Sequence, residues 1–327
     1  MRGLAVLLAL AVAGCDLSPT VDVETPGFEE RLSLRAVLGA GQPARVRVGL
    51  ARDPFAVFQE TPDRAVPDDV TLTLWRGDAL LETVAFASQT CYRSVEASCD
   101  AATGETTVVR AGPFECGRYA GTVPLTPGKV TVRAERDGLP TATATVTIPE
   151  PPAMRARAMG VSDDRAFFGF DLDDDAAPSR YGVSLRREYD RQTVSVCAVG
   201  GARDTTVAFA PRRYTTSFDT SDPVLLPAAR DVDGSYQVVV FDDEAFAGRS
   251  ASFTLDAARD GPARFGLTGR FAVQLAAVSP TLYGYLQETA FALDAETPFD
   301  EPANLPTNVE GGYGHVGAIA ITEAVAE

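Results

Sequence analysis

The side chains in this sequence that could carry chemistry are mostly carboxylates. The densest group is Asp171, Asp173, Asp174 and Asp175. Alternate aspartates, here Asp171, Asp173 and Asp175, can offer hard oxygen ligands to calcium. An EF-hand loop would also need glycine at Ala176 and a bidentate glutamate at Gly182, and the sequence has neither. The pattern therefore favours a solvated turn between strands, and calcium is the weaker alternative.

A second acidic group, Asp242-Asp243-Glu244, could in principle pair a general acid with a general base. Adjacent acids are expected by chance in a chain with 45 Asp and Glu, so a turn is favoured. The sole imidazole is His315, and no Gly-x-Ser-x-Gly motif accompanies it. We therefore expect no enzyme, no metal centre and no cofactor, with an acid-dyad hydrolase as the weakest alternative.

The most specific signal is the cysteine at the end of Val12-Ala13-Gly14-Cys15. Arg2, an apolar run from Leu4 to Val12 and small residues before the cysteine are typical of a bacterial lipoprotein signal peptide. The run is shorter than the roughly 20 residues that a membrane span needs. We predict cleavage before Cys15, a lipid on its thiol and attachment to the cell envelope, with the outer membrane favoured. Residues 16–30, rich in proline and acid, are predicted to be a tether.

The remaining cysteines are Cys91, Cys99, Cys116 and Cys197. Disulfides persist outside the cytoplasm, and four thiols allow three pairings. Three of them cluster, so at least one bridge is expected among Cys91, Cys99 and Cys116, and the short spacing favours Cys91 with Cys99. The lack of a CxxC element and the single histidine argue against zinc.

The formal net charge of −16 excludes several partners. It arises from 45 acidic residues against 29 basic ones, with Lys129 as the single lysine. Nucleic acid would be repelled by this charge, and so would a surface of anionic lipid. We therefore expect the lipid on Cys15 to anchor the protein to the membrane without help from a basic patch.

Apolar residues alternate with polar ones along most of the chain, which predicts a mainly β protein. Short strands and turn signals over residues 31–150 predict an immunoglobulin-like antiparallel sandwich, closed by Ile148-Pro149-Glu150-Pro151-Pro152. Residues 151–327 predict a second β-rich domain. Its one helix is expected at 280–293, because Ser279 is a good N-cap and Pro280 suits the first helical position.

The tail has a glycine-rich segment, Gly311-Gly312-Tyr313-Gly314, followed by His315. Loops of this kind on a rigid sheet often serve recognition, which makes Asn308, Tyr313 and His315 candidate partner-binding residues. The alternative is that the glycines supply unusual backbone angles while the tail completes a sheet through Val316 to Ile321.

Taken together, these pieces resemble the family of envelope lipoproteins catalogued as domain of unknown function 4249. The lipobox carries the resemblance together with three segments, Leu125–Lys129 with Thr141–Pro149, Phe241–Gly248 and Asn308–Gly314. The cysteine-rich insertion from Cys91 to Cys116 departs from the family, as does Asp173-Asp174-Asp175 where an Asp-Pro turn is usual. The resemblance implies two β-rich domains and a gene neighbourhood with outer-membrane TonB-dependent transporters.

We accordingly expect a non-enzymatic lipoprotein that binds a ligand or serves as an accessory subunit of a TonB-dependent uptake system. A structural or adhesive surface lipoprotein without cargo is the alternative. The sequence does not identify the ligand.

Overall fold

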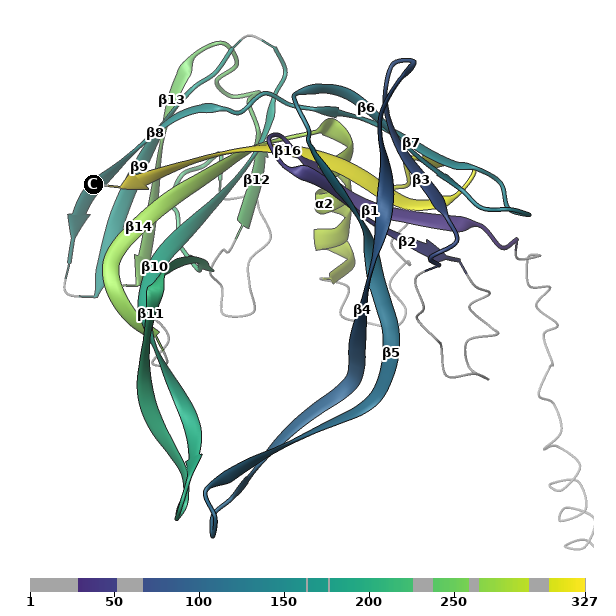
Figure 1. Cartoon of the computed structure of the whole chain (residues 1–327). Coiled ribbons are helices and arrows are strands. Elements are labelled where there is room, and N and C mark those ends of the chain that lie inside the picture. The colour runs from purple at the N-terminus through teal and green to yellow at the C-terminus, as the bar shows by residue number, and fades with distance from the viewer. Residues whose placement is uncertain are drawn as a thin grey trace, which may run out of the picture.

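The computed structural model describes residues 29–51, 67–162, 164–175, 177–225, 238–258, 265–293 and 306–326. Within these ranges the chain is mainly β with one helix near the C-terminus, as predicted (Figure 1). The elements are β1 (Leu32–Gly39), β2 (Pro43–Leu50), β3 (Thr71–Arg76), β4 (Ala79–Asp100), β5 (Glu105–Pro124), β6 (Gly128–Glu135), β7 (Ala142–Ile148), β8 (Ala153–Val161), β9 (Arg165–Asp173), β10 (Arg180–Ala198), β11 (Gly201–Thr216), β12 (Val238–Asp242), β13 (Ser250–Ala258), β14 (Phe265–Val278), α2 (Pro280–Leu293), β15 (Val309–Glu310) and β16 (Tyr313–Ala326).

Thirteen of the strands form one sheet in the order β11-β10-β14-β16-β1-β2-β5-β4-β3-β6-β7-β15, with β12 added beside β10. The other three form a small sheet, β13-β9-β8. The strand β16 joins the two halves of the large sheet, because it pairs in parallel with β1 and antiparallel with β14.

Two clusters of buried residues lie on either side of this junction. In the first, alternate residues of β1 (Leu32, Leu34 and Leu38) pack with residues of β2, β3, β6 and β7. This alternation is the one that the sequence showed, and it places one face of each strand in the core. An immunoglobulin-like strand order for residues 31–150 stays a prediction.

The second cluster lies between the small sheet and the strands β10, β12 and β14. Phe170 and Phe253 from the small sheet stack with ring centroids 4.8 Å apart. The predicted domain boundary near residue 150 separates the second cluster from most residues of the first. The division into two domains stays a prediction. However, Val309, Val316 and Ala318 of the C-terminal tail belong to the first cluster.

The helix α2 packs on β16, and local signals fix where it begins. The Ser279 hydroxyl accepts a hydrogen bond from the Leu282 amide at 3.4 Å, as an N-cap does, and another from the Ala318 amide of β16 at 3.0 Å. Leu282 is buried above Gly317, where any Cβ would lie 2.7 Å from the leucine Cβ. A glycine in the strand is therefore what lets the helix approach.

The glycines of the tail bring its backbone close to two neighbouring strands. Gly311 (φ 72°) and Gly314 (φ 101°) have left-handed backbone angles. A Cβ on Gly314 would lie 2.1 Å from the Leu34 carbonyl oxygen, and one on Gly311 would lie 2.2 Å from the Thr141 carbonyl oxygen. The predicted role of these two glycines in the backbone is thus confirmed, and the tail completes the sheet.

We predict that Gly314→Ala destabilises the protein by about 3 kcal/mol or more, because it adds a backbone clash to the strain of a positive φ. The matched control is Gly41→Ala. Gly41 has a similar φ of 74°, but nothing lies within 4 Å of its Cβ position. That control should cost only about 1 kcal/mol. Thermal unfolding of both variants measures the difference, and equal losses would contradict the close approach.

Candidate functional site

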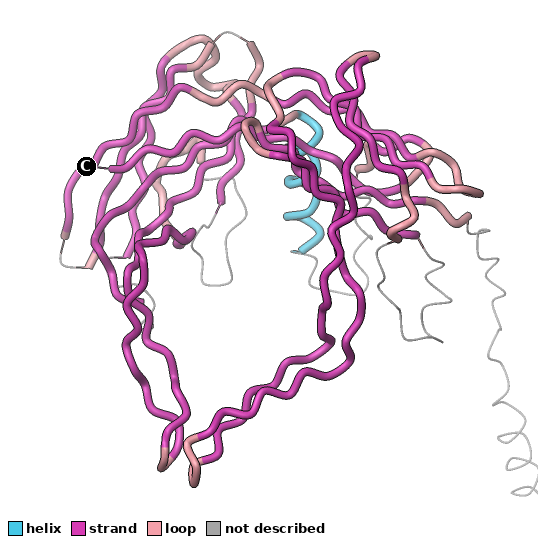
Figure 2. The backbone as a smooth tube through the Cα atoms, viewed as in Figure 1, coloured by secondary structure: helices cyan, strands magenta, loops and turns pink. Residues whose placement is uncertain are grey.

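Two long hairpins extend from the large sheet, and their tips meet (Figures 1 and 2). The first, called here the β4–β5 arm, comprises Ala87–Asp100 and Glu105–Arg118, where the two strands pair only with each other among the described residues. At about 3.3 Å per residue it reaches about 45 Å beyond its base. The second, the β10–β11 arm, comprises Thr193–Ala198 and Gly201–Thr206, beyond the last β10 residue paired with β14.

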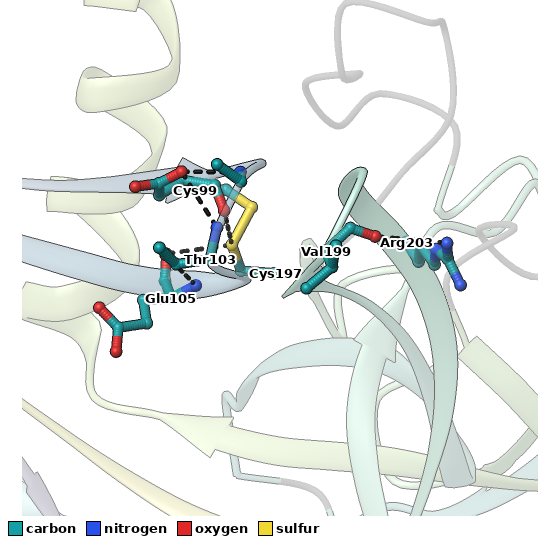
Figure 3. Close-up of a disulfide and its surroundings, with 8 residues drawn as sticks. Cys99, Thr103, Glu105, Cys197, Val199 and Arg203 are labelled. Atoms are coloured by element: carbon teal, nitrogen blue, oxygen red, sulfur yellow. Dashed lines mark hydrogen bonds between the residues drawn. A yellow bond between two sulfur atoms is a disulfide. The ribbon is translucent and has the colours of Figure 1, made fainter.

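A disulfide between Cys99 and Cys197 joins the two tips across 98 residues of sequence (Figure 3). Beside it the Gly200 amide donates a hydrogen bond of 2.7 Å to the Ala101 carbonyl oxygen. The tips are in close backbone contact, because a Cβ on Gly104 would lie 2.7 Å from the Val199 nitrogen. The arms and the sheet that carries them therefore form a closed circuit.

The predicted pairing of Cys91 with Cys99 is wrong. Both residues lie on the continuous strand β4, eight residues apart and so about 26 Å from each other. A disulfide needs Cα atoms within about 7 Å, and the Cα atoms of Cys99 and Cys197 are 5.3 Å apart. Cys91 and Cys116 lie on the neighbouring strands β4 and β5, in register with Phe114 and Gln89. The cysteine-rich insertion from Cys91 to Cys116 therefore forms most of the β4–β5 arm.

Carboxylates fix the turn at the tip and the base of the β4–β5 arm. At the tip, Asp100 accepts hydrogen bonds from the amides of Ala102 and Thr103, which lower the pKa of its carboxyl. At the base, the Glu82 carboxylate accepts hydrogen bonds from the Thr122 amide (2.7 Å) and the Thr122 hydroxyl (2.8 Å). Burial alone would raise the pKa of Glu82, but these hydrogen bonds outweigh it and lower the pKa.

The β10–β11 arm has a comparable base. Glu323 of β16 pairs with Arg213 of β11 and, at 3.4 Å, with Arg186 of β10. Arg186 also donates to the Arg213 carbonyl oxygen at 2.6 Å, and Glu188 lies 3.6 Å from Arg213. Each arm thus begins at a glutamate that ties neighbouring strands together.

The four aspartates Asp171, Asp173, Asp174 and Asp175 contact different partners and do not converge on one point. Asp171 pairs with Arg157 and accepts the Ser252 hydroxyl at 2.6 Å, and these contacts lower the pKa of Asp171. Asp173 accepts the Ser250 hydroxyl at 2.7 Å and lies 3.8 Å from Arg155.

The next two aspartates hold the turn that follows β9. Asp175 accepts the Ala177 amide at 2.8 Å, and Asp174 accepts the Tyr181 hydroxyl at 2.5 Å. The described residues contain no group of three or more His, Cys, Asp or Glu placed to hold a metal ion. Asp171 and Asp173 are strand residues paired across the small sheet, and only Asp174 and Asp175 belong to the predicted turn.

The second acidic group also stabilises a turn. Asp243 is buried and accepts the Ser179 amide at 2.8 Å, while Asp242 accepts the Glu244 amide at 3.2 Å. The Tyr283 hydroxyl of α2 lies 3.5 Å from the other Asp242 oxygen. The turn that the sequence favoured at these residues is what the structure contains.

Two of the three candidate recognition residues in the tail, Asn308 and His315, make contacts within the fold. The Asn308 side chain donates to the Val316 carbonyl oxygen (2.7 Å) and accepts from the Val316 amide (2.9 Å). His315 is buried beneath α2, stacked on Tyr285 with centroids 4.5 Å apart and 3.0 Å from the Thr281 carbonyl oxygen. Both side chains thus hold the tail in the fold, and their proposed role in recognition stays a prediction. Tyr313 is 40% exposed beside Arg31, and its role stays a prediction.

Comparisons with known proteins agree with the resemblance seen in the sequence. A family model described as "Domain of unknown function (DUF4249)" matches residues 18–324. The chain belongs to this family. No curated protein matches it. In the described part of the chain, no helix has the length and apolar character that crossing a membrane requires.

Two solved structures show weak likeness to this chain. One is a beta-glucuronidase from glycoside hydrolase family 2, with 9% identity and a TM-score of 0.18; the match covers 88% of this chain and 22% of that one, so the chain spans about a fifth of that enzyme. The other is the collagen adhesin (CNA) from S. aureus, with 8% identity and a TM-score of 0.18, covering 91% of this chain and 94% of that one. At this TM-score neither likeness bears on fold or function.

Burial lowers the pKa of His315 despite the carbonyl of Thr281, which acts in the opposite direction. The unfolded chain, with a histidine pKa near 6.5, then binds more protons than the folded chain below that pH. We predict that the free energy of unfolding falls as pH drops from 7.5 through 6.5 toward 5.5. His315 is the single histidine, so His315→Gln should flatten this part of the profile. Parallel profiles for the two proteins would contradict the prediction.

Proposed function

We propose that this protein is a non-catalytic lipoprotein of the bacterial cell envelope, which uses its disulfide-joined arms to bind a macromolecular partner. The observation that carries the proposal is the joint between the tips, made by the Cys99–Cys197 disulfide and the hydrogen bond from Gly200 to Ala101. A disulfide of this kind persists in oxidising compartments, which supports export.

The arms contribute little to the two cores. Of the residues described along them, Ser88–Thr90 and Ser98–Asp100 are exposed, and none belongs to either buried cluster. A two-stranded ribbon in water is marginally stable by itself. A disulfide at the tips and glutamates at the bases hold these ribbons in place. A surface that is ordered in advance loses less conformational entropy when it binds a partner.

The open edges of the arms suit recognition by strand addition. Along the β4–β5 arm and along β11, the strands have one partner each among the described residues, so a row of backbone groups faces outward. Such an edge can pair with an extended segment of another protein, which supplies backbone hydrogen bonds while exposed side chains select the partner. Exposed apolar side chains near the tips, Val196 (41%) and Val199 (64%), would add contact area.

The partner we propose is an outer-membrane transporter of the TonB-dependent type, as the family resemblance implies. The net charge of −16 supports a protein partner over nucleic acid or anionic lipid. A lipid on Cys15 would keep the protein at the membrane where such a transporter lies. Cys15 and residues 16–28 of the tether predicted at 16–30 lie outside the described residues.

We predict that Cys15→Ala releases the protein from the membrane fraction or leaves an unprocessed precursor. Two or three acyl chains, at about 0.8 kcal/mol per buried methylene, hold a protein stably, whereas a chain without them has no anchor. Fractionation of cells followed by mass measurement of the N-terminus distinguishes these forms. A processed, unlipidated protein that still sediments with membranes would refute the anchor.

The second prediction concerns the arms. Crosslinking in intact cells should capture a transporter with the native protein, and Cys99→Ser/Cys197→Ser should reduce the yield at least about tenfold, as expected when a preorganised contact worth a few kcal/mol is lost. Because removing a long-range disulfide also lowers stability by roughly 2–5 kcal/mol, a second variant keeps the bridge. In that variant, Val199→Glu, an exposed tip residue becomes charged, and capture should fall without a change in melting temperature.

The matched control is Asp137→Ala, an exposed change in the turn between β6 and β7. It should leave capture unchanged. If the native protein captures no transporter, the partnership is wrong, and a structural or adhesive role becomes the better account. If capture occurs but neither arm variant alters it, the arms are not the binding surface.

A further inference from the structure

A cavity of about 340 Å³ opens on the outer face of the small sheet, away from the arms. It is lined by Met159, Phe167, Ser221, Thr254, Leu255 and Asp256. This volume is at the lower end of the range for small-molecule sites. Neither the arms nor the tail contributes to it, so it calls for an explanation of its own.

Local departures from regular structure build this cavity. A register shift between Ala158 and Gly160 in β8 accompanies the outward position of Met159. Its neighbour on β9 is Gly169, where a Cβ would lie 3.0 Å from the Met159 sulfur. The Arg157 Nε lies at the same distance, so a side chain at that position would require the methionine and the arginine to shift.

The remaining wall comes from Thr254, Leu255 and Asp256 of β13 and from Ser221 in the segment 217–225, which pairs with β13 at one antiparallel bridge. Asp219 and Asp256 pair through their backbones, with N···O distances of 2.7 and 2.9 Å. The Thr220 hydroxyl donates to the Thr254 carbonyl oxygen at 2.8 Å. These bonds hold Ser221 near Thr254, and both residues, which carry hydroxyl groups, line the cavity.

The opposite side is apolar and open to solvent. Met159 is 52% exposed and Phe167 is 40% exposed, and Val161 beside them is 71% exposed. Single exposed apolar residues such as Val161 are ordinary, but two that line the same cavity, as Met159 and Phe167 do, are typical of a binding site. An aromatic ring and a thioether are both good partners for a flat apolar group.

The rim carries net negative charge. Arg165 pairs with both Asp219 and Asp256, one guanidinium against two carboxylates. Asp164 and Asp222, the chain neighbours of Arg165 and Ser221, bind the Ser162 hydroxyl and the Val224 amide, and neither pairs with a cation among the described residues. An anionic ligand would be repelled here, and Arg165 already occupies the place that a bare metal ion would take.

We infer that this cavity binds a small organic cation that carries an apolar ring. The ring lies between Met159 and Phe167, and the cationic group points to the acidic rim and donates hydrogen bonds to Ser221 and Thr254. Attraction of the cation to the face of Phe167 adds to the attraction of the carboxylates. This site is independent of the partner proposed for the arms.

Calorimetric titration of the full-length protein in detergent, with detergent alone as the blank, tests the inference. The probes are phenethylammonium, its anionic counterpart 3-phenylpropionate, the neutral 2-phenylethanol and glucose. Phenethylammonium should bind at least about tenfold more tightly than 3-phenylpropionate and several-fold more tightly than 2-phenylethanol. Added salt should weaken the binding of the cation and leave that of the alcohol unchanged.

Phe167→Ala should weaken phenethylammonium binding about tenfold, and Met159→Ala provides a second wall variant. Asp219→Asn, which keeps the size of the side chain, should reduce the preference for the cation over the alcohol. The matched control is Val161→Ala, which removes an exposed neighbour that does not line the cavity and should leave binding within twofold. Circular dichroism verifies that each variant is folded.

Absence of phenethylammonium binding would overturn the inference. So would equal affinity for 3-phenylpropionate, binding of glucose alone, or binding that both wall variants leave intact.

Discussion

The pairing of β16 with β1 is the interaction on which the rest of the structure depends. Tyr313 to Ile319 lie in parallel register with Ser33 to Gly39, so the end of the chain pairs with its beginning. The same strand pairs with β14, supplies Val316 and Ala318 to the first core, and offers Gly317 and His315 to the helix. These contacts join residues far apart in sequence, so the intervening chain loses conformational entropy before they form. We therefore expect this pairing to be a slow step in folding.

The position of the arms follows from this junction. The β4–β5 arm begins next to β2, and the β10–β11 arm begins next to β14, so β16 and β1 set the distance between their bases. Glu82 and Glu323 then tie neighbouring strands together in the sheet before each ribbon leaves it. With both bases held, the tips are confined to a small region, and the disulfide has less chain entropy to overcome. The tips nevertheless bury little surface, so local opening is expected there before either core unfolds.

The sequence predicted elements whose signals are local. Ser279 and Pro280 predicted the start of the helix, and alternation over Leu32 to Leu38 predicted β1. The arms were not predicted as long hairpins, because a ribbon in solvent has no buried face that must be apolar and so need not show alternation. β11, which contains Pro211, was not predicted. The partner of Cys99 lies 98 residues away, so no spacing rule could have identified it.

The site residues show the same limit. Asp171 and Asp173 alternate along β9, and the arginines and serines that pair with them come from strands on either side, which only the register reveals. The cavity at Phe167 was equally hidden, since its walls come from β8, β9, β13 and the segment after β11. In contrast, a structural role for the tail glycines was predictable, because positive φ angles are open mainly to glycine and so require that residue in the sequence.

The carboxylates at the two ends of the first arm and on the small sheet serve the fold and are poorly suited to act as general bases. A general base works best when its pKa is near the working pH, which requires burial or a neighbouring like charge. Asp100 and Glu82 are instead held by amide donors and Asp171 by arginine and serine, and in each case the pKa is lowered. A carboxylate with a lowered pKa is a weak base and a good hydrogen-bond acceptor, suited to fixing a turn or a strand. The acidic residues of the arms and the small sheet therefore act as structural supports for the surfaces that we propose bind a partner.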